Sequence, residues 1–151
     1  MILLSRKVEY GLMALMHLAG AATVGRPVSA VHIARRHRIP GALLGKVMQA
    51  LTRAGLVESV AGMHGGYQLR RKPAQVALGQ VIAAVDGPIQ LAGCQAHDAC
   101  PQSRGCCVRA PLNRVRGEVI APFSRITLAD LRDEQHGKPS VKKRSRSGRR
   151  V

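Results

Sequence analysis

One stretch of the sequence, GLVESVAGMHGGYQLRR (residues 55–71), decides between two interpretations of the first half of the chain. Its apolar and aromatic residues are typical of two short strands, and the glycine-rich tip between them, residues 62–66, supplies the backbone freedom that a tight turn needs. Arg70, Arg71 and Lys72 place positive charge directly beside the second strand. The stretch therefore predicts a basic β-hairpin with a glycine-rich tip.

Three helices are predicted before this hairpin. Ser5 can cap the first, whose apolar face repeats at intervals of three and four residues: Val8, Leu12, Leu15 and Ala19. Ser29 can cap a second helix, Ala30 to His37, with Val31 and Ala34 on its inner side. After a turn at residues 39–41, a third helix runs to about Ala54, with its inward residues at Leu43, Leu44, Val47, Met48 and Leu51.

Periodicity alone leaves two interpretations of these helices open, an ordinary three-helix core and a helix-turn-helix. The hairpin favours the second, because a helix-turn-helix followed by a basic hairpin is a winged helix. In that geometry the second helix of the pair enters the major groove, while basic flanks contact phosphates. The residues predicted to contact DNA are Ser29, Pro40, Gly41, Lys46, Gln49, Arg53, His64, Arg70 and Arg71.

Length and charge agree with a nucleic-acid partner. The 151 residues allow one domain with appendages, and the formal net charge of +16 favours polyanions. An anionic membrane surface is the competing partner, but no run approaches the roughly 20 apolar residues of a spanning helix. The first residues carry their charges after the apolar ones, which reverses the order of a secretory signal, so we expect a cytoplasmic protein.

All four cysteines lie in one loop-like segment. Cys94, Cys100 and Cys106 are each separated by five residues, among Gly, Pro, Ser and Asp residues that disfavour a regular helix or strand. Because cytoplasmic thiols are kept reduced, metal ligands or a redox sensor are expected rather than structural disulfides. Zinc fits poorly, since its cysteine pairs usually stand two to four residues apart. A cluster-free thiol switch stays open, whereas the lack of a Cys-x-x-Cys motif disfavours a thiol oxidoreductase.

Two helical patterns flank the cysteine segment. Leu78, Val81, Ile82 and Val85 predict a helix before it. After it, Pro111 can open a long helix with one apolar stripe, formed by Leu112, Val115, Val119 and Phe123. The stripe needs a partner, which is either the same helix of a second subunit or the first helix of the same chain.

The chain divides into four predicted segments. They are a winged helix-turn-helix domain (1–90), a cysteine-rich sensing loop (91–108), a dimerisation helix with a C-terminal segment (109–134) and a basic tail (135–151) that is expected to be disordered. The fold class is mainly α, with a small β-hairpin wing and a long C-terminal dimerisation helix.

Several motifs of the chain occur together in one bacterial family. They are Glu9-Tyr10, Ile33-Ala34, Leu51 with residues 54–57, residues 62–69 of the hairpin, residues 81–87, the three evenly spaced cysteines and residues 127–131. On these motifs the chain, from about Leu4 to Leu131, resembles the Rrf-type winged-helix transcriptional regulators, of the iron-sulfur cluster regulator (IscR) and nitric-oxide-sensitive repressor (NsrR) type.

The resemblance implies a transcriptional repressor that binds double-stranded DNA as a homodimer, and not an enzyme with a small-molecule substrate. It implies that an iron-sulfur cluster, two-iron two-sulfur rather than four-iron four-sulfur, controls DNA affinity. The signal would be iron-sulfur status, oxidative stress or nitric oxide. By the same resemblance, Cys94, Cys100 and Cys106 are cluster ligands.

The fourth ligand departs from part of the family pattern. Arg109 stands where the IscR pattern has a histidine, and a guanidinium cannot coordinate iron. In the NsrR pattern, a first-helix carboxylate from the other subunit occupies the position of Glu9, so Glu9 is the predicted fourth ligand. Cys107 and His97 are the competing residues. Ala61 replaces an arginine that is frequent in the family's wing, so the preferred DNA sequence is expected to differ.

Overall fold

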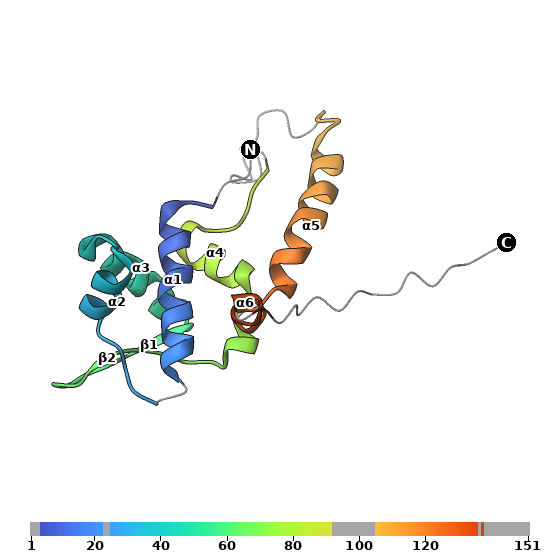
Figure 1. Ribbon diagram of the computed structural model, residues 1–151. Coiled ribbons are helices and arrows are strands. Elements are labelled where there is room, and N and C mark those ends of the chain that lie inside the picture. The colour runs from blue at the N-terminus through green and yellow to red at the C-terminus, as the bar shows by residue number, and fades with distance from the viewer. Residues whose placement is uncertain (1–3, 23–24, 92–104, 136, 138–151) are drawn as a thin grey trace.

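The computed structural model describes residues 4–22, 25–91, 105–135 and 137, and it is mainly helical (Figure 1). The elements, in chain order, are α1 (Arg6–Ala21), α2 (Ala30–His37), α3 (Gly41–Arg53), β1 (Val57–Val60), β2 (Gly66–Leu69), the short 3-10 helix η2 (Pro73–Gln75), α4 (Leu78–Asp86), α5 (Arg109–Arg125) and α6 (Leu128–Gln135). This order confirms the predicted winged helix-turn-helix with a small hairpin and a long later helix.

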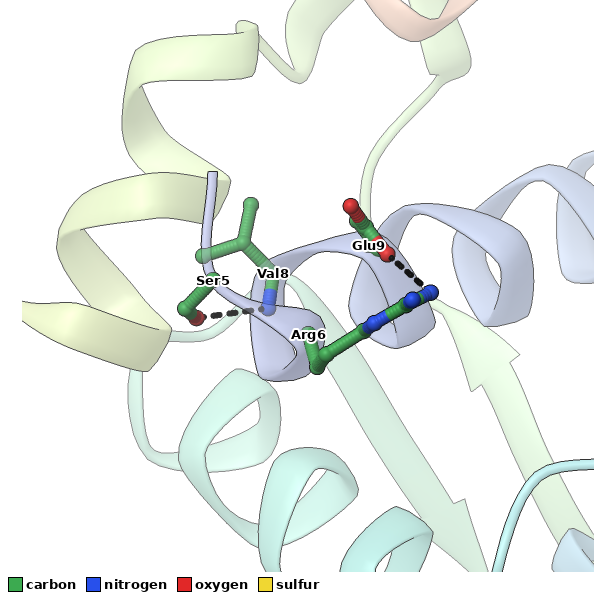
Figure 2. Close-up of polar contacts among 4 residues, drawn as sticks. All are labelled: Ser5, Arg6, Val8 and Glu9. Atoms are coloured by element: carbon green, nitrogen blue, oxygen red, sulfur yellow. Dashed lines mark hydrogen bonds and ion pairs between the residues drawn. The ribbon is translucent and has the colours of Figure 1, made fainter. Parts of the chain in front are cut away.

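Helix α1 is the central element, and α3 and α4 both pack against it. As predicted, the Ser5 side chain caps it by accepting a hydrogen bond from the backbone N–H of Val8 at 3.3 Å (Figure 2). Val8, Leu15 and Ala19 of the predicted face are buried. A Cβ atom on Gly11 would lie 3.3 Å from Cγ1 of Val47, so α1 and α3 are in close contact at this glycine.

Helix α2 begins as predicted but is rotated relative to the prediction. Ser29 caps it by accepting from the N–H of His32 at 3.2 Å. The prediction that Val31 faces inward is wrong, because its side chain is 59% exposed whereas that of Ile33 is fully buried. Two apolar residues three apart do not fix the rotation of an eight-residue helix, and Ile33 is the longer side chain that reaches the core.

The turn between α2 and α3 is stabilised by local hydrogen bonds. Arg38 adopts a left-handed backbone conformation (φ 54°), and the N–H of Ile39 donates to the carbonyl of Ala34 at 2.9 Å. Ile39 is buried, and α3 then buries four of its five predicted inward residues, Leu44, Val47, Met48 and Leu51. This turn sets the angle between the two helices of the helix-turn-helix.

The hairpin has the predicted antiparallel form, with Val57 opposite Leu69 and Val60 opposite Gly66. Its base is tied to α3, because the N–H of Leu56 donates to the carbonyl of Leu51 at 3.0 Å. The segment before α2 pairs with its second strand through two hydrogen bonds between Val28 and Tyr67, of 2.9 and 2.8 Å. The wing is therefore held against the helix-turn-helix at two places.

The C-terminal helices return to the same body. Backbone hydrogen bonds join Leu78 to Ile126 at 2.8 Å and Leu128 to Val76 at 3.0 Å, which fixes the junction between α5 and α6 beside the start of α4. Phe123, at the end of α5, packs against a small cluster that contains Val8 and Ile82. Phe123 therefore packs within the same chain, but mainly beside α4, because a Cβ atom at Gly79 of α4 would lie 3.3 Å from the carbonyl oxygen of Phe123. The predicted alternative named the first helix as the packing partner.

The rest of α5 lies beside α4 without entering the core, and the Nε–H of Arg116 donates a hydrogen bond to the carbonyl oxygen of Ile89 at 2.9 Å. No residue of this fully described helix is buried, and Val115, in the middle of its apolar stripe, is 48% exposed. Helix α5 begins at Arg109, two residues before the predicted Pro111, and it lies on the side of α4 away from α2 and α3 (Figure 1).

Candidate nucleic-acid interface and cysteine site

Helix α3 has a buried apolar face and an exposed polar face. Lys46, Gln49 and Arg53 are all exposed and follow each other at intervals of three and four residues, so they share one face of the helix. Pro40 and Gly41 are exposed at its N-terminal end. The predicted base-reading residues therefore lie together, opposite the side of α3 that packs on the core.

The remaining predicted DNA contacts come from two neighbouring elements. Ser29 is exposed before α2, and its side-chain oxygen is already occupied by the helix cap. His64 is exposed at the tip of the hairpin, and Arg70 and Arg71 are exposed just after β2. In Figure 1 the hairpin, α2 and α3 gather on one side of α1, whereas α5 lies on the other.

A groove of about 700 Å³ lies between the segment before α2 and the tip of the hairpin. Arg26, His32 and Met63, which line it beside Ser29 and His64, are not among the residues predicted from the sequence. Only the spatial pairing of Val28 with Tyr67 brings these two segments together, so no local sequence signal could have found the groove.

The cysteine site is described only in part. Cys94, Cys100 and the competing His97 lie outside the described residues, as does the basic tail from residue 138 onward. Cys106 is half-buried and Cys107 exposed, both as free thiols just before α5. Within the described ranges, no three His, Cys, Asp or Glu side chains are grouped in a way that could hold a metal ion.

The Glu9 carboxylate is partly exposed in the first turns of α1. It accepts a hydrogen bond from the Arg6 guanidinium at 3.1 Å, and the two side chains are 40% and 80% exposed (Figure 2). An exposed ion pair of this kind contributes about 0–1 kcal/mol, so it would compete weakly with another partner for the carboxylate. The Glu9 carboxylate can therefore leave Arg6 for another binding partner at a small cost in free energy.

The family is decided by the extent of one match: the model of the Rrf2 family, described as iron-dependent transcriptional regulators, matches residues 4–134. The chain belongs to the Rrf2 family. It is a transcriptional regulator and not an enzyme, as predicted, and the family implies that it binds DNA.

Individual Rrf2 proteins resemble it over most of their length. The HTH-type transcriptional regulator IscR of Serratia proteamaculans is 35% identical over 133 residues, which are 87% of this chain and 80% of the relative. The solved IscR of T. potens is 26% identical, covers 93% of each chain and has a TM-score of 0.70. CymR, the global cysteine regulator of B. subtilis, is 28% identical over 89% of this chain and 98% of its own, with a TM-score of 0.68.

Among the described helices of this Rrf2 chain, none is long and apolar enough to cross a membrane.

Three histidines connect α1 to the helix-turn-helix of this Rrf2 chain. Nδ1 of His17 lies 3.1 Å from Nε2 of His37, within hydrogen-bonding distance, and the His32 ring is centred 5.4 Å from that of His17. Burial, followed by the nearby His37, His32 and Arg36, lowers the pKa of His17 below its usual 6.5. Burial, followed by Arg36 and His32, likewise lowers the pKa of His37. The pair therefore favours the neutral state.

Acidification is expected to lower the melting temperature through this pair. Because both pKa values are lower in the folded protein, the unfolded chain binds more protons near pH 6, and stability falls as the pH drops through about 6.5. Thermal unfolding between about pH 7.5 and 5.5 should therefore depend less on pH in a His17→Gln/His37→Gln variant. His64→Gln, at an exposed site on the wing, is the control and should keep the wild-type dependence. An unchanged pH dependence in the double variant would contradict the role of the pair.

Proposed function

We propose that this Rrf2 regulator is a homodimeric repressor whose affinity for DNA is controlled by an iron-sulfur cluster. The set of sulfur donors supports the proposal: three thiols at equal spacing in the sequence, Cys94, Cys100 and Cys106, precede the helix that would join the subunits. Iron-sulfur clusters are held by thiolates, and a cluster bound there would supply a centre sensitive to oxidants, nitric oxide or iron-sulfur status. We retain a two-iron two-sulfur cluster as the proposed form.

The proposed fourth ligand is Glu9 of the partner subunit. Its carboxylate is partly exposed and is paired only with the exposed Arg6 among the contacts observed. Carboxylate oxygen is a hard donor, so it would be held less firmly than thiolate on iron and would be the first ligand displaced by a signal. Cys107 remains as an exposed thiol beside Cys106, without an assigned role.

The contact between α1 and α3 supports a route from Glu9 to DNA. Gly11, two residues after Glu9, lies against Val47 of α3, while Lys46 and Gln49 on either side of Val47 are exposed. Packed cores transmit displacements because they contain few voids. A change of partner at Glu9 that moves α1 would therefore move the helix that presents the base-reading residues.

The DNA affinities of two single-residue variants test the proposed interface. Gln49→Ala should weaken binding to a duplex selected by the wild-type protein by about 1–3 kcal/mol, with little effect on a scrambled duplex, because an amide reads a base edge. Arg71→Ala should weaken both duplexes alike, because a phosphate contact carries no sequence information. Fluorescence anisotropy titrations of both variants on both duplexes decide this. Equal losses on the two duplexes for Gln49→Ala would rule out base reading by this residue.

A cluster-free thiol switch is the second candidate function. It is favoured by the structural likeness to CymR, described as a global cysteine regulator, and by the free thiols of Cys106 and Cys107. Oxidation would then convert thiols to sulfenates or disulfides. Iron and sulfide analysis of protein purified without oxygen separates the candidates, because the thiol switch contains neither.

A further inference from the structure

The tip of the wing presents an unusually exposed apolar side chain. Met63 is 96% exposed, and Figure 1 shows the hairpin extending away from the helices. A single exposed apolar residue is ordinary on a protein surface. Met63, however, lies at the tip of the hairpin and lines the same groove as Arg26, His32 and His64.

The groove is fixed in shape by close backbone approaches. The two hydrogen bonds between Val28 and Tyr67 join its walls. A Cβ atom at Gly66 would lie 2.4 Å from the carbonyl oxygen of Val28, and one at Gly65 would lie 2.2 Å from that of Val60. A larger residue at Gly66 would push the segment before α2 away from the wing, whereas one at Gly65 would distort the hairpin turn itself. The close approach of the segment before α2 to the wing therefore requires glycine at position 66.

The polar lining of the groove suits an anion. Arg26 contributes a permanent positive charge, and the imidazoles of His32 and His64 add hydrogen-bonding groups. The Ser29 hydroxyl accepts the cap hydrogen bond through its oxygen and can still donate its own hydrogen to an anion. None of the side chains that line the groove is acidic. A phosphate of the DNA backbone matches this lining, and the neighbouring Met63 would then extend past the strand toward the minor groove.

We infer that the groove holds one backbone phosphate and that Met63 inserts into the adjacent minor groove, where it selects A·T over G·C pairs; this inference rests on the proposed DNA-binding function. The N2 amino group of guanine projects into the minor groove and offers a hydrogen-bond donor that the thioether satisfies poorly. An A·T pair lacks this group, so an apolar side chain can approach the groove floor. Apolar side chains, methionine among them, are used in this way by minor-groove proteins.

The test uses duplexes that differ only at the wing-contacted steps. A duplex selected by the wild-type protein from a random pool is prepared with A·T, G·C or inosine·C pairs at those steps. Inosine keeps the hydrogen-bonding edge of guanine in the major groove but lacks the N2 amino group. The wild-type protein should bind the A·T and inosine·C duplexes about tenfold more tightly than the G·C duplex.

Variants separate the two parts of the inference. Met63→Ala should remove the preference, Met63→Leu should keep it, and Arg26→Ala should weaken all three duplexes alike and reduce the slope of log affinity against log salt by about 1. A tenfold preference that survives in Met63→Ala, or a salt slope that is unchanged in Arg26→Ala, would overturn the inference. Failure of the wild-type protein to select any duplex would instead overturn the proposed function.

Discussion

Replacing Val115 with Asp is expected to convert the proposed dimer into monomers. Val115 lies in the middle of the apolar stripe of α5, is 48% exposed within one subunit and has no buried neighbour on its own helix. In a dimer formed through this stripe, the new carboxylate would be buried without a partner, which costs several kcal/mol. Loss of the second DNA-binding unit should then weaken binding to a two-fold symmetric operator by about 100-fold or more.

Sedimentation velocity measures the expected dissociation, and a DNA titration of the same samples measures its consequence. Val31→Asp is the matched control, because Val31 is also an exposed valine, with 59% exposure on α2. This control should remain dimeric. A Val115→Asp protein that sediments as a dimer would show that the subunits associate through another surface.

Serine substitution of Cys94, Cys100 or Cys106 is expected to leave the protein without a cluster. A serine hydroxyl does not replace a thiolate as a firm iron ligand, so each variant purified without oxygen should lose nearly all its iron, sulfide and visible absorption. Cys107→Ser should retain all three. Cluster loss in Cys107→Ser, with retention in Cys106→Ser, would reassign the ligand to the exposed thiol.

The fourth ligand is tested in the same preparations. Glu9→Ala should keep the fold and the dimer but alter the absorption spectrum and hasten cluster loss in air. Glu118→Ala removes an exposed carboxylate from α5 and should do neither. If Glu9→Ala keeps the wild-type spectrum and lifetime while His97→Ala loses the cluster, the fourth ligand lies within the cysteine loop.

The helix ends and the hairpin were predictable because their signals are local. Ser5 and Ser29 cap the helices that follow them, and the glycine-rich stretch forms the predicted wing. The rotation of α2 was not predictable, since Val31 and Ile33 are both apolar and only packing against α1 and α3 chooses between them. The local sequence pattern thus predicts the helices and strands, whereas tertiary contacts determine which face of each element is buried.

The same contrast between local pattern and tertiary contacts applies to the candidate sites. The exposed face of α3 follows from helical spacing, so Lys46, Gln49 and Arg53 could be selected from the sequence. The contact of His17 with His37 joins residues 20 positions apart, and the groove beside Met63 depends on strand pairing with Val28. No periodicity predicts either. The cysteine ligands and the four-segment division remain predictions.

Control of DNA affinity by an iron-sulfur cluster can be measured on the wild-type protein purified without oxygen. Iron, sulfide and the absorption spectrum are measured first, and affinity for the selected duplex is measured before and after removal of the cluster. We expect a brown protein with iron and sulfide whose affinity for DNA changes about tenfold or more when the cluster is removed. A colourless protein that contains zinc or no metal, or a brown one whose DNA affinity does not change on cluster removal, would contradict it.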